Sequence, residues 1–289
     1  MDGAKLPDAR KALTVLRDEW STCQKCRLGE RRLAGGYNFV FGTGYTRTIM
    51  FIGDGPNEES EFTGVPFVGS SGGVLRTLLA RLGLKEYYLT NLVSCRSCEP
   101  MTNSSGALIQ RKQGSVMVTM YKDELPIPAH YTACKPRLNE EVYIVDPTVI
   151  VGLGAKACEA LVGRPINLAR ENGEARPIGI PGATYVPELT DKGQHWIRKV
   201  KGQVIQPIRQ SEVRYHFVPT YHPRDVEKVM DDLGPGSLFS KFSRALREAI
   251  QTHDAYVAGA YGMEPTNRGQ VSDLDLQHAV QEITQHEEA

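Results

Sequence analysis

Residues 48–83 read TIMFIGDGPNEESEFTGVPFVGSSGGVLRTLLARLG and contain the clearest strand–loop–helix pattern of the chain. It opens with the apolar run 48–52, which has the length of a buried strand and ends at a glycine. The loop that follows is too rich in Gly, Pro and Ser to predict regular structure. The stretch closes with a predicted helix, because the apolar residues of 74–82 share one face and Gly83 can end it.

The same order of strand, loop and helix recurs along the chain. Further strands are predicted at 87–93, 148–152 and 215–219, and helices at 9–20, 155–163, 238–251 and between Cys134 and Pro147. Apolar strands that alternate with helices predict an α/β protein, with a three-layer α/β/α fold around a central, mostly parallel four-stranded sheet. Ligands bind such folds where loops leave the carboxyl ends of the strands. Three polar loops do so, after Ile52, at Asn91 and at His222.

The charge of the chain is divided unevenly. Its 34 Lys and Arg residues equal its 34 Asp and Glu residues, and 40% of its residues are hydrophobic, which is ordinary globular composition. Residues 251–289 hold seven of the acids and one base, which leaves 33 bases and 27 acids in residues 1–250, a net charge of +6. We predict a single domain over 1–254 with insertions at about 100–130 and 164–212, followed by a flexible acidic tail over 255–289.

The chain shows no sign of a membrane or secretion segment. No apolar run approaches the ~18 residues that a membrane helix needs. The first twenty residues scatter their charges and lack the apolar core of a signal peptide. We therefore expect a cytoplasmic protein with no membrane partner.

Six cysteines in such a chain are expected to be metal ligands, catalytic thiols or core residues rather than disulfides. They are Cys23, Cys26, Cys95, Cys98, Cys134 and Cys158, of which the first four form two C-x-x-C pairs. The 68 residues between the pairs exclude a compact zinc ribbon, whose pairs usually lie about 15–20 residues apart, but not a site assembled across the fold. Thiolates suit zinc and iron–sulfur clusters alike, so both metals stay open.

Five segments, in order, resemble the uracil-DNA glycosylase superfamily, in particular its iron–sulfur class. They are FIGDGPNEESEFTGVPFVGSSGGVL (51–75), LTNLVSC (89–95), ACKPRL (133–138), DPTVIVGLGAKA (146–157) and VPTYHP (218–223). One such segment alone carries no weight, whereas five in the same order with four cysteines among them make a specific pattern. The resemblance spans most of 23–223 and implies a member from a bacterial or phage-infected cell, enlarged by insertions.

The resemblance implies a 4Fe–4S cluster with a structural role, because base excision transfers no electrons. Its expected ligands are Cys23, Cys26, Cys95 and Cys134. Spacing alone would pair Cys95 with Cys98, so Cys98 stays the alternative ligand, and zinc stays the alternative metal. Cys158 is then a core residue of the helix over 155–162.

The resemblance also implies an enzyme that hydrolyses the N-glycosidic bond of uracil, or of a related pyrimidine, in DNA and leaves an abasic site. His222 is expected to donate a hydrogen bond to the uracil carbonyl on which negative charge develops. Asp54 stands where the class usually carries Glu, and is expected to orient the attacking water and to stabilise the cationic sugar. Because Asp is one methylene shorter, Glu58, Glu59 and Glu61 remain candidates for the same task.

Four residues are expected to bind the substrate. Asn91 presents an amide donor and an amide acceptor, which together can read the edge of uracil. Phe67 is expected to stack on the flipped base. Gly53 and Gly55 complete the set, with backbone amides that can approach the DNA closely.

DNA, single- or double-stranded, is the expected partner. Its further contacts are expected from Ser70 and Ser71 in the run before a helix, from Arg224, and from the basic strip with Arg198, Lys199 and Lys201. Arg224 follows His222-Pro223 where no long apolar residue is available to fill the vacated base stack. The acidic tail is expected to bind a replication or repair protein, and the chain to be a monomer.

Other functions remain open. Asn57 stands where the class usually has Gly, and together with Asp54 it favours a catalytically silent relative that binds DNA or a replication partner, or a glycosylase for another modified base. The VGLGAKA segment suggests nucleotide binding, but it lacks the third Gly and the spaced acid of a dinucleotide site. A redox carrier is the last alternative, although no flavin motif accompanies the cysteines.

Overall fold

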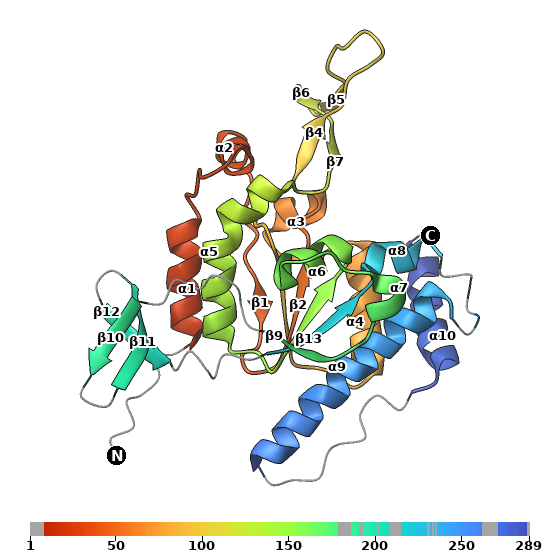
Figure 1. Ribbon diagram of the computed structural model, residues 1–289. Helices are drawn as coiled ribbons and strands as arrows, with labels where there is room; N and C mark the ends of the chain where they lie inside the picture. Colours follow the sequence, from red (N-terminus) through yellow and green to blue (C-terminus); the bar gives the residue numbers. More distant parts are fainter. Residues whose placement is uncertain are drawn as a thin grey trace.

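Figure 1 shows the structure, a computed structural model that describes residues 9–178, 186–190, 193–200, 203–208, 215–229, 232, 234, 236–261 and 271–287. Its centre is a six-stranded sheet. In spatial order the strands are β1 (Thr43–Gly44), β3 (Tyr87–Asn91), β2 (Ile49–Gly53), β8 (Val149–Leu153), β13 (Tyr215–Thr220) and β9 (Arg176–Ile178). The four inner strands pair in parallel, and the short edge strands β1 and β9 pair antiparallel to them. The predicted four-stranded parallel sheet is confirmed, with two edge strands added.

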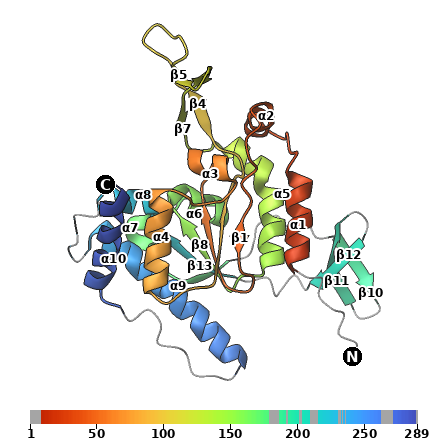
Figure 2. The ribbon, with the colours of Figure 1, turned by 180° about the vertical axis from the view of Figure 1, so that it is seen from behind.

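Both faces of the sheet are covered by helices, because each strand points apolar side chains alternately to either face. Ile49 and Phe51 share one core with α4 (Ser70–Arg81), α9 (Leu238–Tyr261) and α10 (Asp273–Glu287). Met50 and Ile52 pack on the other face with α5 (Pro128–Val145) and α6 (Ala155–Val162). Figure 2 shows α1 (Ala9–Trp20) outside α5, which completes the layers. The three-layer α/β/α prediction is confirmed.

The loop after β2 contains a helix that its composition did not predict. This helix, α3 (Glu58–Thr63), begins after Asn57, whose side-chain oxygen accepts a hydrogen bond from the Ser60 N–H at 2.9 Å. It ends at Gly64, which has φ 75°, a left-handed conformation that glycine adopts readily. Two good caps suffice for so short a helix, so the expectation of an irregular loop is wrong here.

The acidic C-terminal segment folds against the body of the protein. Helix α9 continues to Tyr261, and α10 follows after residues that lie outside the described ranges. Leu276 and Val280 of α10 are buried in the core beside α4. Asp273 of α10 pairs with Arg247 of α9 at 2.7 Å. The flexible tail predicted for 255–289 is therefore wrong over α10, because a short apolar stripe is enough to dock it.

Both predicted insertions contain antiparallel strands. In the first, β4 (Cys98–Pro100) pairs with β7 (Tyr121–Asp123), and β5 (Gln110–Gln113) pairs with β6 (Val116–Thr119). Residues 98–123 form an arm that projects away from the body above α3 (Figure 1). The second insertion contains a separate sheet of β10 (Val186–Thr190), β11 (Gly193–Val200) and β12 (Gln203–Ile208). Within the described ranges, no helix combines the length and the apolar character that crossing a bilayer requires.

An ion pair between Arg137 and Glu141, one turn apart on α5, is completely buried. Glu141 accepts hydrogen bonds from the hydroxyls of Tyr88 at 2.8 Å and Thr90 at 3.0 Å, both on β3. Arg137 donates to the main-chain carbonyl of Asn91 at 2.6 Å. Because these contacts hold the last residues of β3, the pair fixes α5 against the carboxyl end of the sheet.

Replacing Arg137 by Met leaves Glu141 buried without its partner, which typically costs about 3–5 kcal/mol. We expect a loss of that size in the free energy of unfolding, measured by urea denaturation. The double variant R137M/E141L removes both charges and should recover most of the stability.

The matched control is Arg17→Met, which breaks an exposed pair with Asp18. Exposed pairs contribute little, so this variant should unfold at nearly the parental urea concentration. Similar losses in R17M and R137M, or a double variant as unstable as R137M, would contradict the prediction.

Candidate active site

A cavity of about 390 Å³ opens at the carboxyl ends of β2, β3 and β13. The structure brings eight of the predicted site residues to its wall. They are Asp54, Gly55, Phe67, Ser70, Ser71, Asn91, His222 and Arg224. Parallel strands end at the same edge of the sheet, so three loops that are far apart in the sequence meet there.

The floor of the cavity depends on Gly53. A Cβ at this position would lie 2.6 Å from Cζ of Phe67 and 2.8 Å from Oδ1 of Asn91, so only glycine allows both side chains to meet over the end of β2. Phe67 has φ 57°, a backbone conformation that bulky residues rarely adopt. The Arg76 guanidinium of α4 donates a hydrogen bond to the Phe67 carbonyl and holds this turn. The aromatic face is therefore fixed beside the Asn91 amide.

His222 is held as a neutral imidazole with its proton on one defined nitrogen. It precedes the short helix α8 (Pro223–Glu227), and its Nδ1 accepts a hydrogen bond from the Arg224 N–H at 3.1 Å. A neutral ring that accepts at Nδ1 carries its proton at Nε2. Burial, together with the charges of Arg224 and Lys228, lowers the pKa of His222 from 6.5 to about 3. The Phe67 ring stacks beside it, with centroids 6.5 Å apart.

Asp54 is a buried carboxylic acid, only 8% exposed. Burial raises its pKa from 3.8 to about 6, although the Arg224 charge and a hydrogen bond from the Ala157 N–H oppose the rise. Its Oδ1 has no hydrogen-bond partner among the described residues. A Cβ on Gly154 would lie 3.6 Å from Asp54 Oδ2 and 3.3 Å from the His222 Cβ, so the two groups flank the same turn.

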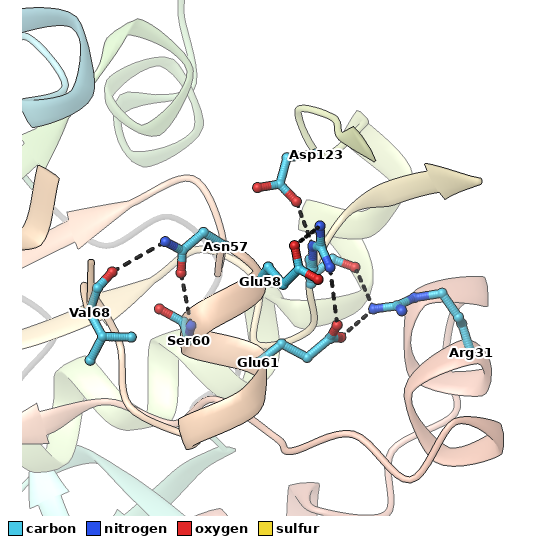
Figure 3. Close-up of polar contacts among 8 residues, drawn as sticks. Arg31, Asn57, Glu58, Ser60, Glu61, Val68 and Asp123 are labelled. Atoms are coloured by element: carbon cyan, nitrogen blue, oxygen red, sulfur yellow. Dashed lines mark hydrogen bonds and ion pairs between the residues drawn. The ribbon is translucent and has the colours of Figure 1, made fainter. Parts of the chain in front are cut away.

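Ion pairs turn Glu58 and Glu61 of α3 away from the cavity. Glu61, 2% exposed, pairs with Arg31 of α2 (Arg27–Ala34), and Glu58 pairs with Arg96 at 3.5 Å (Figure 3). These two acids and Glu59 are absent from the cavity wall. The structure therefore does not bring Glu58, Glu59 or Glu61 to the task expected of Asp54.

Asn57 lines the cavity and closes the loop that contains α3. Besides capping Ser60, it donates from Nδ2 to the carbonyl of Val68 at 3.2 Å, and Figure 3 shows these two contacts on opposite sides of its amide. An asparagine where the class usually has glycine thus ties the start of the loop to its end. It also adds a polar side chain to the cavity wall.

Four of the cysteines lie within electrostatic range of one another. Burial, together with the neighbouring thiols of Cys134 and Cys26, raises the pKa of Cys95 to about 12, against the opposing charge of Arg32. Burial also raises the pKa of Cys134, again with contributions from Cys26 and from Cys23. The structure thus brings together the four residues named as cluster ligands.

Cys98 faces charged groups instead. Burial raises its pKa, and Arg31 and Arg96 oppose the rise. Cys158 lies in the core and donates its thiol hydrogen to the Gly152 carbonyl at 3.2 Å, in keeping with its predicted core position. All six cysteines are free. Among the described residues, no three Cys, His, Asp or Glu close around one point as a single metal ion would require.

Some predicted contacts fall outside the described part of the chain. Lys201 does, and so do the side chains of Arg198 and Lys199 on β11. The cavity wall also includes residues 123–126 at the base of the arm, which the sequence analysis missed. The sequence carries no signal for residues 123–126, because the insertion shows no helical repeat and none of the five segments that resemble the superfamily lies in it.

The fold and the cavity agree with a comparison to known families. Residues 40–251 match the profile of the uracil DNA glycosylase superfamily. The chain belongs to this superfamily. The matched span contains all four inner strands of the sheet and every residue of the cavity wall, so membership covers the site as well as the fold.

Relatives of this superfamily member include proteins named type-4 uracil-DNA glycosylase. The one from Sulfurisphaera tokodaii is 33% identical over 225 residues, which is 76% of this chain and 81% of the relative. The one from Thermotoga maritima is 31% identical over 165 residues, or 56% of this chain and 72% of the relative. A third, from Archaeoglobus fulgidus, is 29% identical over 211 residues, or 72% and 79%.

Asp54→Asn should stabilise the protein in a pH-dependent manner. The folded pKa of about 6 exceeds the ordinary value of 3.8, so the native state holds the proton more tightly. The contribution of Asp54 to stability is then complete below its unfolded pKa and is lost as pH rises through about 6. Above that pH the Asn variant should gain up to about 3 kcal/mol.

Urea denaturation across this pH range measures the difference, which should vanish as the acid becomes protonated in both states. The control is Asp18→Asn, because the side chain of Asp18 on α1 is 67% exposed. A gain that stays constant with pH, or an equal gain in the control, would show that burial of the Asp54 charge is not its cause.

Proposed function

We propose that this superfamily member hydrolyses the N-glycosidic bond of uracil, or of a related pyrimidine, in DNA and leaves an abasic site. Its relatives named above carry the name uracil-DNA glycosylase. The observation that carries the proposal is one cavity that holds a buried carboxyl, Asp54, and a neutral imidazole, His222. These two groups match the opposite charges that develop when such a bond breaks.

Base recognition rests on Phe67 and Asn91. A target base must leave the DNA stack, which costs a few kcal/mol, before it can enter the cavity. There the fixed Phe67 ring offers a face for stacking, and the Asn91 amide offers a donor for O4 and an acceptor for N3–H of uracil. Cytosine presents the reverse pattern at these two atoms, so the same amide would discriminate between them.

His222 acts on the departing base. Its Nε2–H is the ring donor left over once Nδ1 has accepted from Arg224. Bond cleavage places negative charge on the uracil carbonyl oxygen, and a preorganised donor stabilises that charge in the transition state. Because the pKa of His222 is lowered to about 3, the ring stays neutral and donor-competent throughout the physiological range.

Asp54 acts on the sugar. Its pKa of about 6 leaves it mostly ionised at neutral pH, so it can stabilise the positive charge that develops on the sugar. Its unpartnered Oδ1 is the acceptor with which it would orient the attacking water. Because Asp54 is one methylene shorter than a glutamate, the sugar must approach the β2 loop closely. The small residues Gly53 and Gly55 permit that approach.

DNA backbone contacts follow from the polar rim of the cavity. Ser70 and Ser71 open the twelve-residue helix α4, whose first amides point toward the N-terminal end, where phosphate binds favourably. Arg224 is exposed on the other side and lines the same cavity. These contacts read no sequence, in keeping with an enzyme that selects a base and not its neighbours.

We propose that Cys23, Cys26, Cys95 and Cys134 hold a 4Fe–4S cluster. Iron–sulfur clusters take thiolate ligands, and these four thiols are neighbours in the fold. Arg32 lies beside Cys95 and Arg137 beside Cys134, where their charges would balance the thiolates. When bound, the cluster would supply a cross-link between the segment before α2, the segment after β3, and α5.

His222→Ala should lower single-turnover excision of uracil by roughly 10²–10³-fold, the usual loss for one preorganised donor. The substrate is an oligonucleotide with a single uracil, and alkali cleavage of the abasic product reports excision. His216→Ala is the matched control, because His216 lies on β13, the strand that leads to His222, away from the cavity wall. It should keep the parental rate.

A parental chain that binds the oligonucleotide but releases no uracil would instead favour the catalytically silent alternative. Release of another modified base instead of uracil would show that the enzyme is a glycosylase for that base. An unchanged rate in H222A would remove His222 from the mechanism.

Cys134→Ser should remove the visible absorbance of the purified protein and most of its iron and sulfide. Cys98→Ser, the matched control, should keep both, because Cys98 faces Arg31 and Arg96 rather than the other thiols. The readouts are the absorption spectrum before and after reduction, and metal analysis. A colourless protein with stoichiometric zinc, or equal loss in the two variants, would contradict the assignment.

A further inference from the structure

Leu125 is an exposed apolar residue at the rim of the cavity. The part of the chain that the structure describes includes eleven large hydrophobic side chains that are exposed, and of these only Leu125 also lines the cavity. Its side chain is 49% exposed. Any ligand that covers this leucine removes apolar surface from water, which favours binding.

The backbone on both sides of Leu125 is anchored. The Glu124 N–H donates to the carbonyl of Ser97 at 2.9 Å. Pro126 is buried, and its Cγ would lie 3.3 Å from a Cβ on Gly55 in the loop of Asp54. Pro126 thus packs inward, whereas Leu125 beside it is exposed.

The base of the arm is also fixed to the body. Arg96, with a side chain 5% exposed, donates to Asp123 at 2.5 Å and pairs with Glu58 of α3. Figure 3 shows that Asp123 and Glu58 come from different elements to these ion pairs. The Arg31 guanidinium lies 5.5 Å from the ring of Tyr121 on β7. The segment that carries Leu125 therefore needs no ordering when a ligand binds.

The part of the cavity wall that α8 supplies has no exposed apolar side chain. Helix α8 contributes Arg224 and Glu227 to the wall. Val226, between them, is completely buried in the core. Val229 is exposed but lies outside the cavity wall. Among the described residues of 223–229, then, none can offer an apolar side chain at the cavity mouth.

We propose that Leu125 enters the DNA base stack as a wedge when a nucleotide turns into the cavity. The inference rests on the proposed function. A nucleotide that leaves a duplex vacates a gap between stacked bases, and proteins fill such gaps with apolar side chains such as leucine. Leu125 has the required chemistry, exposure and rigid support at the mouth through which the nucleotide passes, while Arg224 lines the same cavity as a phosphate contact.

The wedge matters most where a base pair must be opened. Leu125→Ala should therefore lower the ratio of the excision rate on a duplex to the rate on the same single strand by roughly 10- to 100-fold. The duplex carries uracil opposite adenine, and a second duplex carries it opposite an abasic site. The second should show a smaller drop, because its uracil is already unpaired.

Ile127→Ala is the matched control. Ile127 is also 49% exposed and lies two residues away, but it is not part of the cavity wall. Its rate ratio should equal that of the parent. Leu125→Met, which keeps a long apolar side chain, should restore the ratio that Leu125→Ala loses.

Two outcomes would overturn the wedge while leaving the proposed function intact. One is an L125A variant with the parental rate ratio, and the other is a parent that excises uracil from single strands alone. If the parent excises from neither substrate, the proposed function fails, and 2-aminopurine placed beside the uracil decides the wedge. A rise in 2-aminopurine fluorescence when the parent binds, absent when L125A binds, would support the wedge. No rise with the parent would overturn it.

Discussion

The buried pair of Arg137 and Glu141 is the interaction on which the functional end of the molecule depends. Both charges are removed from water, so each must be matched by partners, and those partners are the hydroxyls and carbonyls at the end of β3. Asn91 is thereby held where a base would be read. Arg137 also lies beside Cys134, so one side chain connects β3 with the cysteine region. Such a network specifies one arrangement of α5 on the sheet.

The same burial that builds the cavity sets the charge states within it. Asp54 has its pKa raised to about 6 and His222 has its pKa lowered to about 3, and desolvation is the largest cause of both shifts. Desolvation disfavours the charged form of each group, so the acid resists ionisation and the imidazole stays neutral. At neutral pH Asp54 is nonetheless mostly ionised. The cost of burying its charge therefore lowers the free energy of unfolding. The site is thus less stable than a neutral one, as is usual where function requires a charge.

Sequence patterns predicted the inner strands and the helices α1, α4, α5, α6 and α9, because runs such as 149–153 are apolar over a full strand length and the helical leucines share one face. They missed α3, whose stability comes from the caps Asn57 and Gly64, and α10, which docks through two or three apolar residues. Composition averages over a segment, whereas a cap or a docking stripe depends on single positions. For the same reason Arg137 and Glu141 look like an ordinary exposed pair until α5 is packed on β3.

By itself, the sequence determined the order of strands and helices, the residues at the carboxyl ends of the strands, and the resemblance of five segments to one superfamily. Those ends meet in any parallel sheet, so the grouping of Asp54, Asn91 and His222 followed from topology. Only the tertiary structure decided the neutral state of His222, the turn of Glu58 and Glu61 away from the cavity, and the place of Leu125 at its mouth. All three depend on burial and on contacts between segments that are distant in the sequence, and a local sequence pattern predicts neither.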